Sequence, residues 1–529
     1  MATLMDDEEG YLRTIDKLID IGAALSSETI VDHLLDRILE SAIEITNADG
    51  GTLYRLTQNQ SLEFAIFINQ SLDIHTGRSE GQLFTYPPIP LYFGEVENYT
   101  AIAATCALSK ASVNIVNAYD AEEFDLSEAK VFDFKTGYHT QSVLAVPLIN
   151  PQGEVLGVLQ LINCLNQEGV PQGFSIFSQK LTESLASQAA VALTNRLLVD
   201  QLHDLFEGVA NLINTAIDEK SPYTAGHCKR VPELTLMLAE AAHKEDAGPL
   251  TDFTMTDKDR YELKIAGMLH DCGKITTPVH VVDKGTKLET IFDRIHLIET
   301  RFDVLRKDMK IRYLEACIEA PDQQAFLQQT YDEALQQLDE DLAFLKQCNI
   351  GAERMSEEDF LRIKAIESHQ WYNELGQQQS LLSEDEVHNL SIVAGTLTKA
   401  ERGVIDYHIV STIKLLDQVP WPAHLKNVPE YACGHHERMD GNGYPKGLTR
   451  EQMSLQARMM GIADIFEALT AADRPYKKGM PLSRSLAIMS RMKMEGHIDP
   501  DLFDVFIKHG LHIDYAKRYL EPEQLDMPI

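Results

Sequence analysis

Residues 435–445 read HHERMDGNGYP and place two adjacent histidines, a glutamate and an aspartate immediately before a Gly-x-Gly-Tyr-Pro turn. Imidazole and carboxylate groups bind divalent metals and transfer protons. Gly441 and Gly443 permit backbone angles or close approaches that other residues resist, and Pro445 stiffens the exit of the turn. The stretch predicts a fixed loop beside two histidines that are candidate metal ligands.

Four other short segments of the same half contain histidine or acid beside glycine, a cation or apolar residues. They are GHCKRV (226–231), LHDCGK (269–274), IDYH (405–408) and IADIFEAL (462–469). A centre with two divalent metals needs about six to eight such ligands in one place. Seven candidate metal ligands are His227, His270, Asp271, His408, His435, His436 and Asp464.

Any one of these histidines, taken alone, is more often a hydrogen-bonded structural residue than a metal ligand. The chain contains its own comparison, because QLHDLF carries a further His-Asp pair, His203 and Asp204, on the polar side of a helical stripe. That pair is typical of a solvated helix face. Several apolar-flanked segments together with one His-His pair are difficult to explain by core packing, so the combination favours a metal site.

The first part of the chain predicts an α+β sensor module over residues 15–195. Helical periodicity over 11–47 is followed by the strand-like runs TLYRL and LEFAIFI. Two further runs, SVLAVPLI and VLGVLQLI, flank the turn NPQGE at 150–154, where Pro and Gly indicate a hairpin. An antiparallel sheet with helices is the expected architecture.

From residue 198 the apolar positions follow a 4-3-4-3-4 spacing, which is typical of a coiled-coil seam. They are Leu198, Leu202, Leu205, Val209, Leu212 and Ala216. We interpret 196–220 as a long helical linker, which either forms the seam of a parallel homodimer or packs on its own domain. The first alternative is favoured because the stripe joins two domains.

Beyond residue 220 helical signals dominate, so the second domain is expected to be all-α. Two apolar repeats predict a helical hairpin inserted over residues 285–396. The first repeat comprises Ile291, Ile295, Ile298, Phe302 and Leu305, and the second comprises Leu335, Leu338, Leu342 and Leu345. The predicted fold class is therefore multidomain, with the α+β module joined by a long helix to an all-α domain that carries an insertion.

Residues 205–520 resemble the HD-GYP domain, a subfamily of the HD phosphohydrolases that hydrolyses cyclic dinucleotides. HDCGK matches HDxGK, HHERMDGNGYPKGL matches HHExxDGxGYPxGL, and LTKAERGVIDYH matches the helix that precedes it. ADIFEALTAADRPYK resembles the closing motif but is one residue longer between Asp464 and Arg474 than the commonest form.

The resemblance implies a shared role for Asp271, which would bridge two metals and act in catalysis. His227, His270 and Asp464 would complete the ligands of one metal, and His408, His435 and His436 those of the other. Some members hold a third metal through a glutamate four residues before the first histidine, where this chain has Tyr223. Two divalent ions, iron or manganese, are therefore expected.

The same resemblance assigns residues to the substrate. Lys274, which also belongs to the catalytic set, Arg474 and Lys477 are the cations that would face phosphate. Gly443, Tyr444 and Pro445 would line the substrate, with Tyr444 offering a hydroxyl and an aromatic face. Each cation has a surface salt bridge as its alternative role. Glu437 and Asp440 are expected to orient the histidines rather than to bind metal.

Residues 15–195 resemble a GAF domain, and TGYHTQSVLAVPLINPQGEVLGVLQLIN is the stretch that carries this resemblance. GAF domains that bind cyclic nucleotides often carry an Asn-Lys…Phe-Asp/Glu signature. This chain has no lysine after Asn163 and has Ser175 after Phe174. The ligand of this domain is unknown from the sequence.

The net charge is −34, from 47 Lys plus Arg against 81 Asp plus Glu. This charge disfavours sequence-independent binding to a nucleic acid polymer. No apolar run approaches the roughly 18 residues that span a bilayer, and the N-terminal MATLMDDEEG is acidic where a signal peptide is basic. The seven cysteines show no CxxC spacing, so neither a disulfide framework nor a zinc ribbon is predicted. A cytoplasmic protein without a membrane partner is expected.

The sequence thus favours metal-dependent hydrolysis of a cyclic dinucleotide, above all cyclic di-GMP, to pGpG, GMP or both, under the control of a GAF sensor. Cyclic GMP-AMP is an alternative substrate. A catalytically silent receptor for a cyclic dinucleotide or a partner protein is a different class of function; the seven retained ligands disfavour it, and the insertion favours it. The complete GYP segment weakens a further hypothesis, that the protein hydrolyses an ordinary nucleotide.

Overall fold

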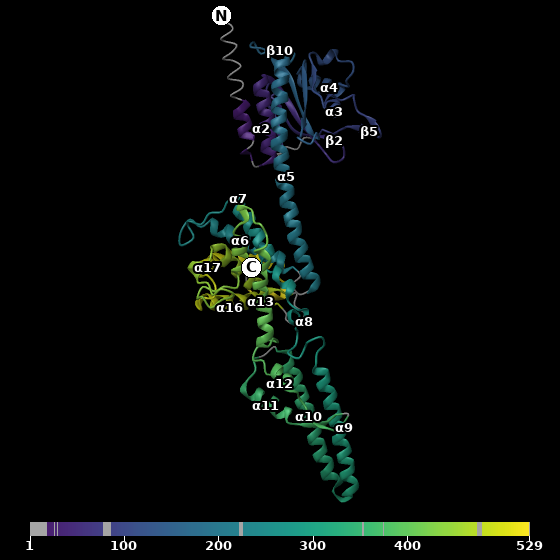
Figure 1. Cartoon of the computed structure of the whole chain (residues 1–529), viewed down its shortest axis with the longest axis vertical. Helices are drawn as coiled ribbons and strands as arrows, with labels where there is room; N and C mark the ends of the chain where they lie inside the picture. Colours follow the sequence, from purple (N-terminus) through teal and green to yellow (C-terminus); the bar gives the residue numbers. More distant parts are fainter. Residues whose placement is uncertain are drawn as a thin grey trace. The chain divides into compact units, whose positions relative to one another are not determined.

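The computed structural model describes residues 18–527 apart from 26, 29, 78–85, 222–225, 352–353, 374 and 473–478. The chain forms two compact units, Met1–Leu205 and Phe206–Ile529. Helix α5 (Ile176–Lys220) has 45 residues, so it begins in the first unit and ends in the second (Figure 1). Among the described residues, none of the helices combines the length and apolarity needed to cross a bilayer.

The main sheet of the first unit is antiparallel and has the strand order β3-β2-β1-β9-β8-β7, and β5 (Tyr92–Phe93) pairs with β6 (Val96–Glu97) in a separate small sheet. Its longest strands are β1 (Ala48–Leu56), β2 (Ser61–Asn69), β8 (Val143–Ile149) and β9 (Val155–Leu165). The shorter ones are β3 (Ile74–Gly77), β7 (Val113–Ile115), β4 (Ile89–Pro90), paired with β2, and β10 (Pro171–Gln172), paired with β9. Strands β8 and β9 form the hairpin predicted around residues 150–154.

Alternating side chains along each strand build two separate cores on the two faces of this sheet. Leu53 belongs to one core, which also contains residues of α2 (Val31–Thr46) and of the first part of α5, and the adjacent Tyr54 belongs to the other. The second core is completed by α3 (Ile102–Ser109). Helices therefore cover both faces of the sheet, and the predicted α+β architecture is confirmed.

The second unit is mostly helical, and one apolar core joins its helices. They are α6 (His227–His243), α7 (Asp257–Leu269), α13 (Lys399–Leu416), α14 (Val428–Cys433), α15 (Leu455–Thr470), α16 (Leu482–Met494), α17 (Pro500–Lys508) and α18 (Leu511–Tyr519). The short helix α8 (Val279–Val282) contributes no residue to this core. A five-residue 3-10 helix, η4 (Cys272–Thr276), follows α7. The predicted helical character of this unit is confirmed, apart from one short pair of strands in the segment described next.

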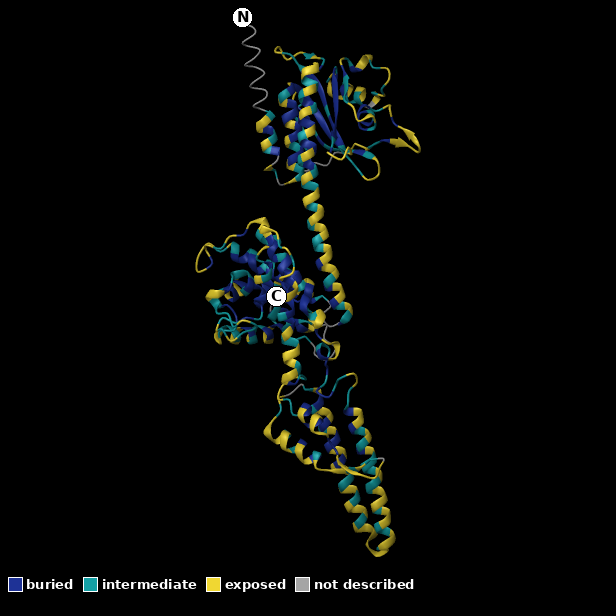
Figure 2. Cartoon of the chain, in the orientation of Figure 1, coloured by how far each residue is buried: buried dark blue, intermediate teal, exposed yellow. Residues whose placement is uncertain are grey.

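A segment between α8 and α13 has an apolar core of its own, which extends from Leu288 to Leu390. It contains α9 (Ile295–Glu319), α10 (Gln324–Ile350), α11 (Glu357–Glu367), α12 (Glu384–Leu390) and the short strands β11 (Gln370–Tyr372) and β12 (Gln378–Ser380). Much of the helical hairpin formed by α9 and α10 is exposed (Figure 2). The expected place of Ile291 in the apolar repeat was wrong: it precedes α9 and is 95% exposed.

Candidate active site

Seven side chains, which lie in or next to six helical elements, form the candidate site. His227 is the first residue of α6, His270 follows α7, and Asp271 precedes η4. His408 lies in α13, His435 and His436 follow α14 after Gly434, and Asp464 lies in α15. The structure therefore brings together all seven residues that the sequence proposed as ligands, although 237 positions separate His227 from Asp464 in the chain.

The first group of ligand atoms surrounds one oxygen of Asp271. The Oδ2 atom lies 3.0 Å from His227 Nε2 and 3.3 Å from His270 Nε2. His227 Nε2 also lies 3.2 Å from Asp464 Oδ1. The three residues His227, His270 and Asp271 are buried, and their ligand atoms lie within 4.8 Å of one another. Two imidazoles and two carboxylates in one place form a donor set suited to a transition metal.

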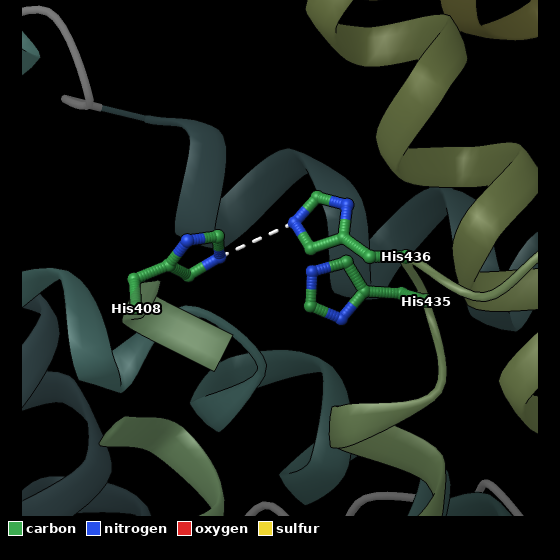
Figure 3. Close-up of side chains that lie close together, drawn as sticks. All are labelled: His408, His435 and His436. Atoms are coloured by element: carbon green, nitrogen blue, oxygen red, sulfur yellow. Dashed lines mark hydrogen bonds between the residues drawn. The ribbon is translucent and has the colours of Figure 1, made fainter. Parts of the chain in front are cut away.

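The second group consists of three imidazoles, from His408, His435 and His436 (Figure 3). The Nε2 atoms of His408 and His436 are 3.2 Å apart. Asp271 Oδ1, the other oxygen of the shared carboxylate, lies 3.3 Å from His408 Nε2. The two oxygens of Asp271 therefore face different groups of imidazoles, which is the geometry that a bridging ligand requires.

Hydrogen bonds on the far side of three rings determine which nitrogen faces the site. The Nδ1 atoms of His270, His408 and His435 each lie 2.6 Å from the carbonyl oxygen three residues earlier in the chain. A carbonyl oxygen only accepts, so each Nδ1 carries the proton and donates it. In the neutral ring, the Nε2 lone pair is then directed into the site, as metal binding demands.

Two buried atoms at the centre form no hydrogen bond within the described part of the chain: His435 Nε2 and Asp271 Oδ1. Unsatisfied polar atoms in a protein interior are costly, and both are electron-pair donors. A divalent cation between them would satisfy both. The residues present therefore fit a metal centre, by the chemistry of their donors as well as by their number.

The surroundings of His435, His436 and Asp464 favour the forms of these three groups that bind metal. Burial, with the neighbouring imidazoles, lowers the pKa of His435 well below its usual value, and burial lowers the pKa of His436 to about 4. Burial alone would raise the pKa of Asp464, but the surrounding imidazoles, His227 first, hold it below its usual value. At neutral pH the two imidazoles are neutral and the carboxylate is ionised, which are the states that bind cations.

Glu467 is a site residue that the sequence reasoning missed. Its carboxylate accepts a hydrogen bond from His227 Nδ1 at 2.5 Å and one from Arg230 Nε at 2.8 Å, and its side chain is almost fully buried. Carboxylates behind metal-binding imidazoles fix the ring and increase its basicity. The signal was present, because Glu467 lies three residues after Asp464 on the same helix and therefore on the same face.

Lys274 is the described cation nearest to the shared carboxylate. Its Nζ atom lies 2.5 Å from Asp271 Oδ2. Burial alone would lower the pKa of Lys274, but Asp271 and Asp464 raise it, so the side chain is charged. The other two predicted phosphate-facing cations, Arg474 and Lys477, lie outside the described residues, as does Tyr223.

Glu437 and Asp440, which are expected to orient the histidines, form hydrogen bonds within the loop. Glu437 accepts hydrogen bonds from the backbone N–H groups of Lys446 at 2.7 Å and Leu448 at 2.8 Å. Asp440 accepts from Asn442 N and from the guanidinium of Arg438. Both carboxylates therefore hold the loop itself.

The loop after the paired histidines is closely packed at Gly443. A Cβ atom there would lie 2.4 Å from Arg438 N and 2.5 Å from Glu437 Cα, so only glycine fits. The ring of Tyr444 stacks on His436 with 4.8 Å between ring centroids, and its backbone N–H donates to the His436 carbonyl. Pro445 follows at the exit, and the loop thus places an aromatic residue against a candidate ligand.

Comparisons with known proteins confirm both resemblances at the level of domains. The GAF domain family matches residues 31–193, and the HD domain family matches residues 383–502. A cyclic di-GMP phosphodiesterase of Pseudomonas aeruginosa is 40% identical over 114 residues, which cover 22% of this chain and 26% of that protein. A 3'3'-cGAMP-specific phosphodiesterase of Vibrio cholerae is 38% identical over 109 residues, covering 21% and 23%.

The chain thus spans about a quarter of the length of these curated relatives. Among solved structures, the GAF domain of an Acinetobacter phosphoenolpyruvate-protein phosphotransferase is similar at 18% identity with a TM-score of 0.27, over 36% of this chain and 98% of that one.

Proposed function

Since this chain joins a GAF domain to an HD domain whose relatives are cyclic dinucleotide phosphodiesterases, we propose that it hydrolyses a cyclic dinucleotide with the help of divalent metals. The observation that carries the proposal is the position of Asp271, whose two oxygens face two separate groups of imidazoles. The proposed domains are 15–195 for the sensor, 196–220 for the linker, 205–520 for the HD-GYP domain and 285–396 for its insertion.

Each residue has a defined part in this proposal. One cation would be held by His227, His270 and Asp464. A second would be held by His408, His435 and His436, and Asp271 would bind both cations. Two bound cations would activate water and stabilise the charge that develops on phosphate. Iron or manganese suits a donor set of imidazoles and carboxylates.

The substrate would be held by groups beside the metal ligands. Lys274 contributes a positive charge, which reduces the repulsion between an anionic phosphodiester and a protein of net charge −34. Arg474 and Lys477 are proposed to add to this charge. The loop residues Gly443, Tyr444 and Pro445 would form the adjoining wall, where the stacked tyrosine offers an aromatic face to a base.

Cyclic di-GMP is the proposed substrate, with pGpG, GMP or both as products. Cyclic GMP-AMP is the second candidate, because one of the similar proteins is specific for it. A silent receptor is disfavoured because a protein that only binds has no need of seven ligands. We further propose that the GAF domain regulates turnover and that a parallel homodimer forms through the apolar stripe of α5.

A substrate panel tests the proposed function. Full-length protein, purified anaerobically and loaded with Mn²⁺ or Fe²⁺, is incubated with cyclic di-GMP, cyclic GMP-AMP and deoxynucleotides. We expect cleavage of cyclic dinucleotides alone, and loss of cleavage after chelation or in His435→Ala. Binding of a cyclic dinucleotide without product would instead identify a receptor, and hydrolysis of the deoxynucleotides alone would identify a generic HD enzyme.

Regulation is tested by comparing the turnover of the full chain with that of residues 205–529 across candidate GAF ligands. A ligand that changes the rate of the full chain only would support control by the sensor domain. Equal rates with every ligand would remove that part of the proposal.

A further inference from the structure

The last residue of α5 contacts the turn that follows Asp271. Lys220 Nζ donates hydrogen bonds to three backbone carbonyl oxygens: Ile275 O at 2.6 Å, Thr277 O at 2.5 Å and Lys274 O at 3.3 Å. An ammonium group has three N–H donors and no acceptor. All three donors of Lys220 are therefore used on η4 and the residue that ends it.

The residue next to Lys220 forms a second contact with the same segment. The hydroxyl of the buried Ser221 hydrogen-bonds to Asp283, which ends α8. The end of α5 thus contacts both the beginning and the end of the segment 274–283. A segment held at two points follows the motion of the helix that holds it.

The opposite side of the turn packs tightly against α13. The backbone N–H of Gly273 donates to Thr412 Oγ1 at 3.0 Å, and a Cβ atom on Gly273 would lie only 2.0 Å from the carbonyl oxygen of His408. The turn is therefore in close backbone contact with α13 at Gly273. Displacement of the turn therefore changes the spacing between Asp271 and His408, now 3.3 Å between Oδ1 and Nε2.

Lys274 connects these contacts to the site. Its backbone carbonyl accepts from Lys220, and its own ammonium lies 2.5 Å from Asp271 Oδ2. One residue of the turn is thus held by the linker helix through its backbone while its side chain contacts the shared carboxylate. A second tie between α5 and this unit, from Lys264 Nζ to Glu207 Oε1 at 2.8 Å, reaches α7 rather than the turn.

We propose that Lys220 is a positioning residue, which holds the Asp271–Lys274 turn in its productive place from the end of α5. The link makes Lys220 the point at which a displacement of the linker helix reaches the metal ligands. The expected effect on turnover rests on the proposed function, whereas the effect on metal binding does not.

The test compares Lys220→Met with Lys264→Met in the full-length protein. Both variants remove one ammonium that ties α5 to the second unit, so nonspecific loosening of the helix affects them equally. The readouts are the apparent Mn²⁺ affinity, by competition with a chelating dye, and kcat and KM for the substrate that the wild type cleaves. We expect Lys220→Met to bind Mn²⁺ about 10-fold more weakly and to lose about 10- to 100-fold in kcat, with KM little changed.

Lys220→Arg, which keeps the charge but not the compact tripod of donors, should fall between the wild type and Lys220→Met. If Lys220→Met does not fold, Lys220→Gln is measured in its place. The proposal is overturned if the Lys220 variants match Lys264→Met in metal affinity and kcat. If the wild type cleaves none of the panel, the proposed function fails, and the Mn²⁺ affinities still decide the role of Lys220.

Discussion

At the scale of single residues, the orientation of each imidazole in the site depends on the hydrogen-bond partner of its Nδ1 atom. Three rings donate from Nδ1 to a carbonyl of their own chain segment, three residues earlier. His227 differs, because its Nδ1 contacts the carboxylate of Glu467. A carboxylate there adds negative charge near one of the two proposed metals, so the two positions are not equivalent.

Replacing Glu467 by glutamine tests this difference. The amide keeps the shape but loses the charge that increases the basicity of His227, so we expect about a 10- to 100-fold loss of metal affinity. Metal content and Mn²⁺ affinity are measured, with the exposed Glu451→Gln as the control. Wild-type affinity in Glu467→Gln would show that this carboxylate has only a packing role.

Gly443 offers a second test at the same scale. An alanine Cβ would overlap the backbone at Arg438 and Glu437, so the loop must shift and carry Tyr444 away from His436. We expect Gly443→Ala to lower kcat/KM by about 100-fold, the effect of a displacement of about 1 Å.

Gly403→Ala in α13 is the matched control, because no atom from outside its own stretch of helix lies within 4 Å of its Cβ position. Alanine there should stabilise the helix by about 0.5–1 kcal/mol and leave activity unchanged. Equal activities would contradict the role of the loop.

At the scale of elements, the segment between α8 and α13 is tied at its base by two buried lysines. Lys284 Nζ donates to both oxygens of Glu401 at 2.8 and 2.9 Å, and Lys287 Nζ donates to the carbonyls of Leu390 and Ile392. Glu401 also completes the N-terminal capping box of α13, the helix that carries His408. The base of the inserted helices is therefore joined to an element of the site.

A buried ion pair makes the stability of this segment depend on pH. Burial alone would raise the pKa of Glu386, but the bidentate bonds from Arg301, with the N–H of Ser383, hold it below the ordinary value. A depressed folded-state pKa stabilises the fold fully above the unfolded-state value of about 4.3, and this stabilisation is lost as the pH falls through the folded-state pKa.

Glu386→Gln should therefore cost about 3 kcal/mol at pH 7, because it leaves the partly buried Arg301 without a counter-charge. The difference from the wild type should shrink as the pH falls below about 4.3. Denaturant unfolding is followed by the fluorescence of Trp371 in a Trp421→Phe background, since the chain has two tryptophans. A difference that stays constant as the pH falls from 7 to well below about 4.3 would contradict the assignment.

At the scale of the whole molecule, two units with separate cores share one helix. The apolar stripe of α5 is exposed in the single chain: Leu198, Leu202, Leu205, Val209 and Leu212 are each 49–68% exposed (Figure 2). A stripe with heptad-like spacing is buried most simply by the same stripe of a second copy. This is the basis of the proposed parallel homodimer.

Leu202→Glu combined with Leu205→Glu should separate such a dimer into monomers, because four like charges would face one another across the seam. Molar mass is measured by size-exclusion chromatography with light scattering. Asn211→Glu is the control, since nine helical positions place it opposite Leu202. An unchanged mass in the double variant, or a monomeric wild type, would contradict the proposed dimer through the stripe of α5.

The sequence by itself determined the fold class and the seven candidate ligands, because hydrophobic periodicity and the order of short motifs are local properties of a chain. Only the tertiary structure decided the partners of those residues. Glu467 and His227 are 240 positions apart, and Lys220 contacts a turn more than 50 positions away. Contacts of this kind depend on how helices pack, and a side chain's partner is therefore not encoded in its immediate neighbours.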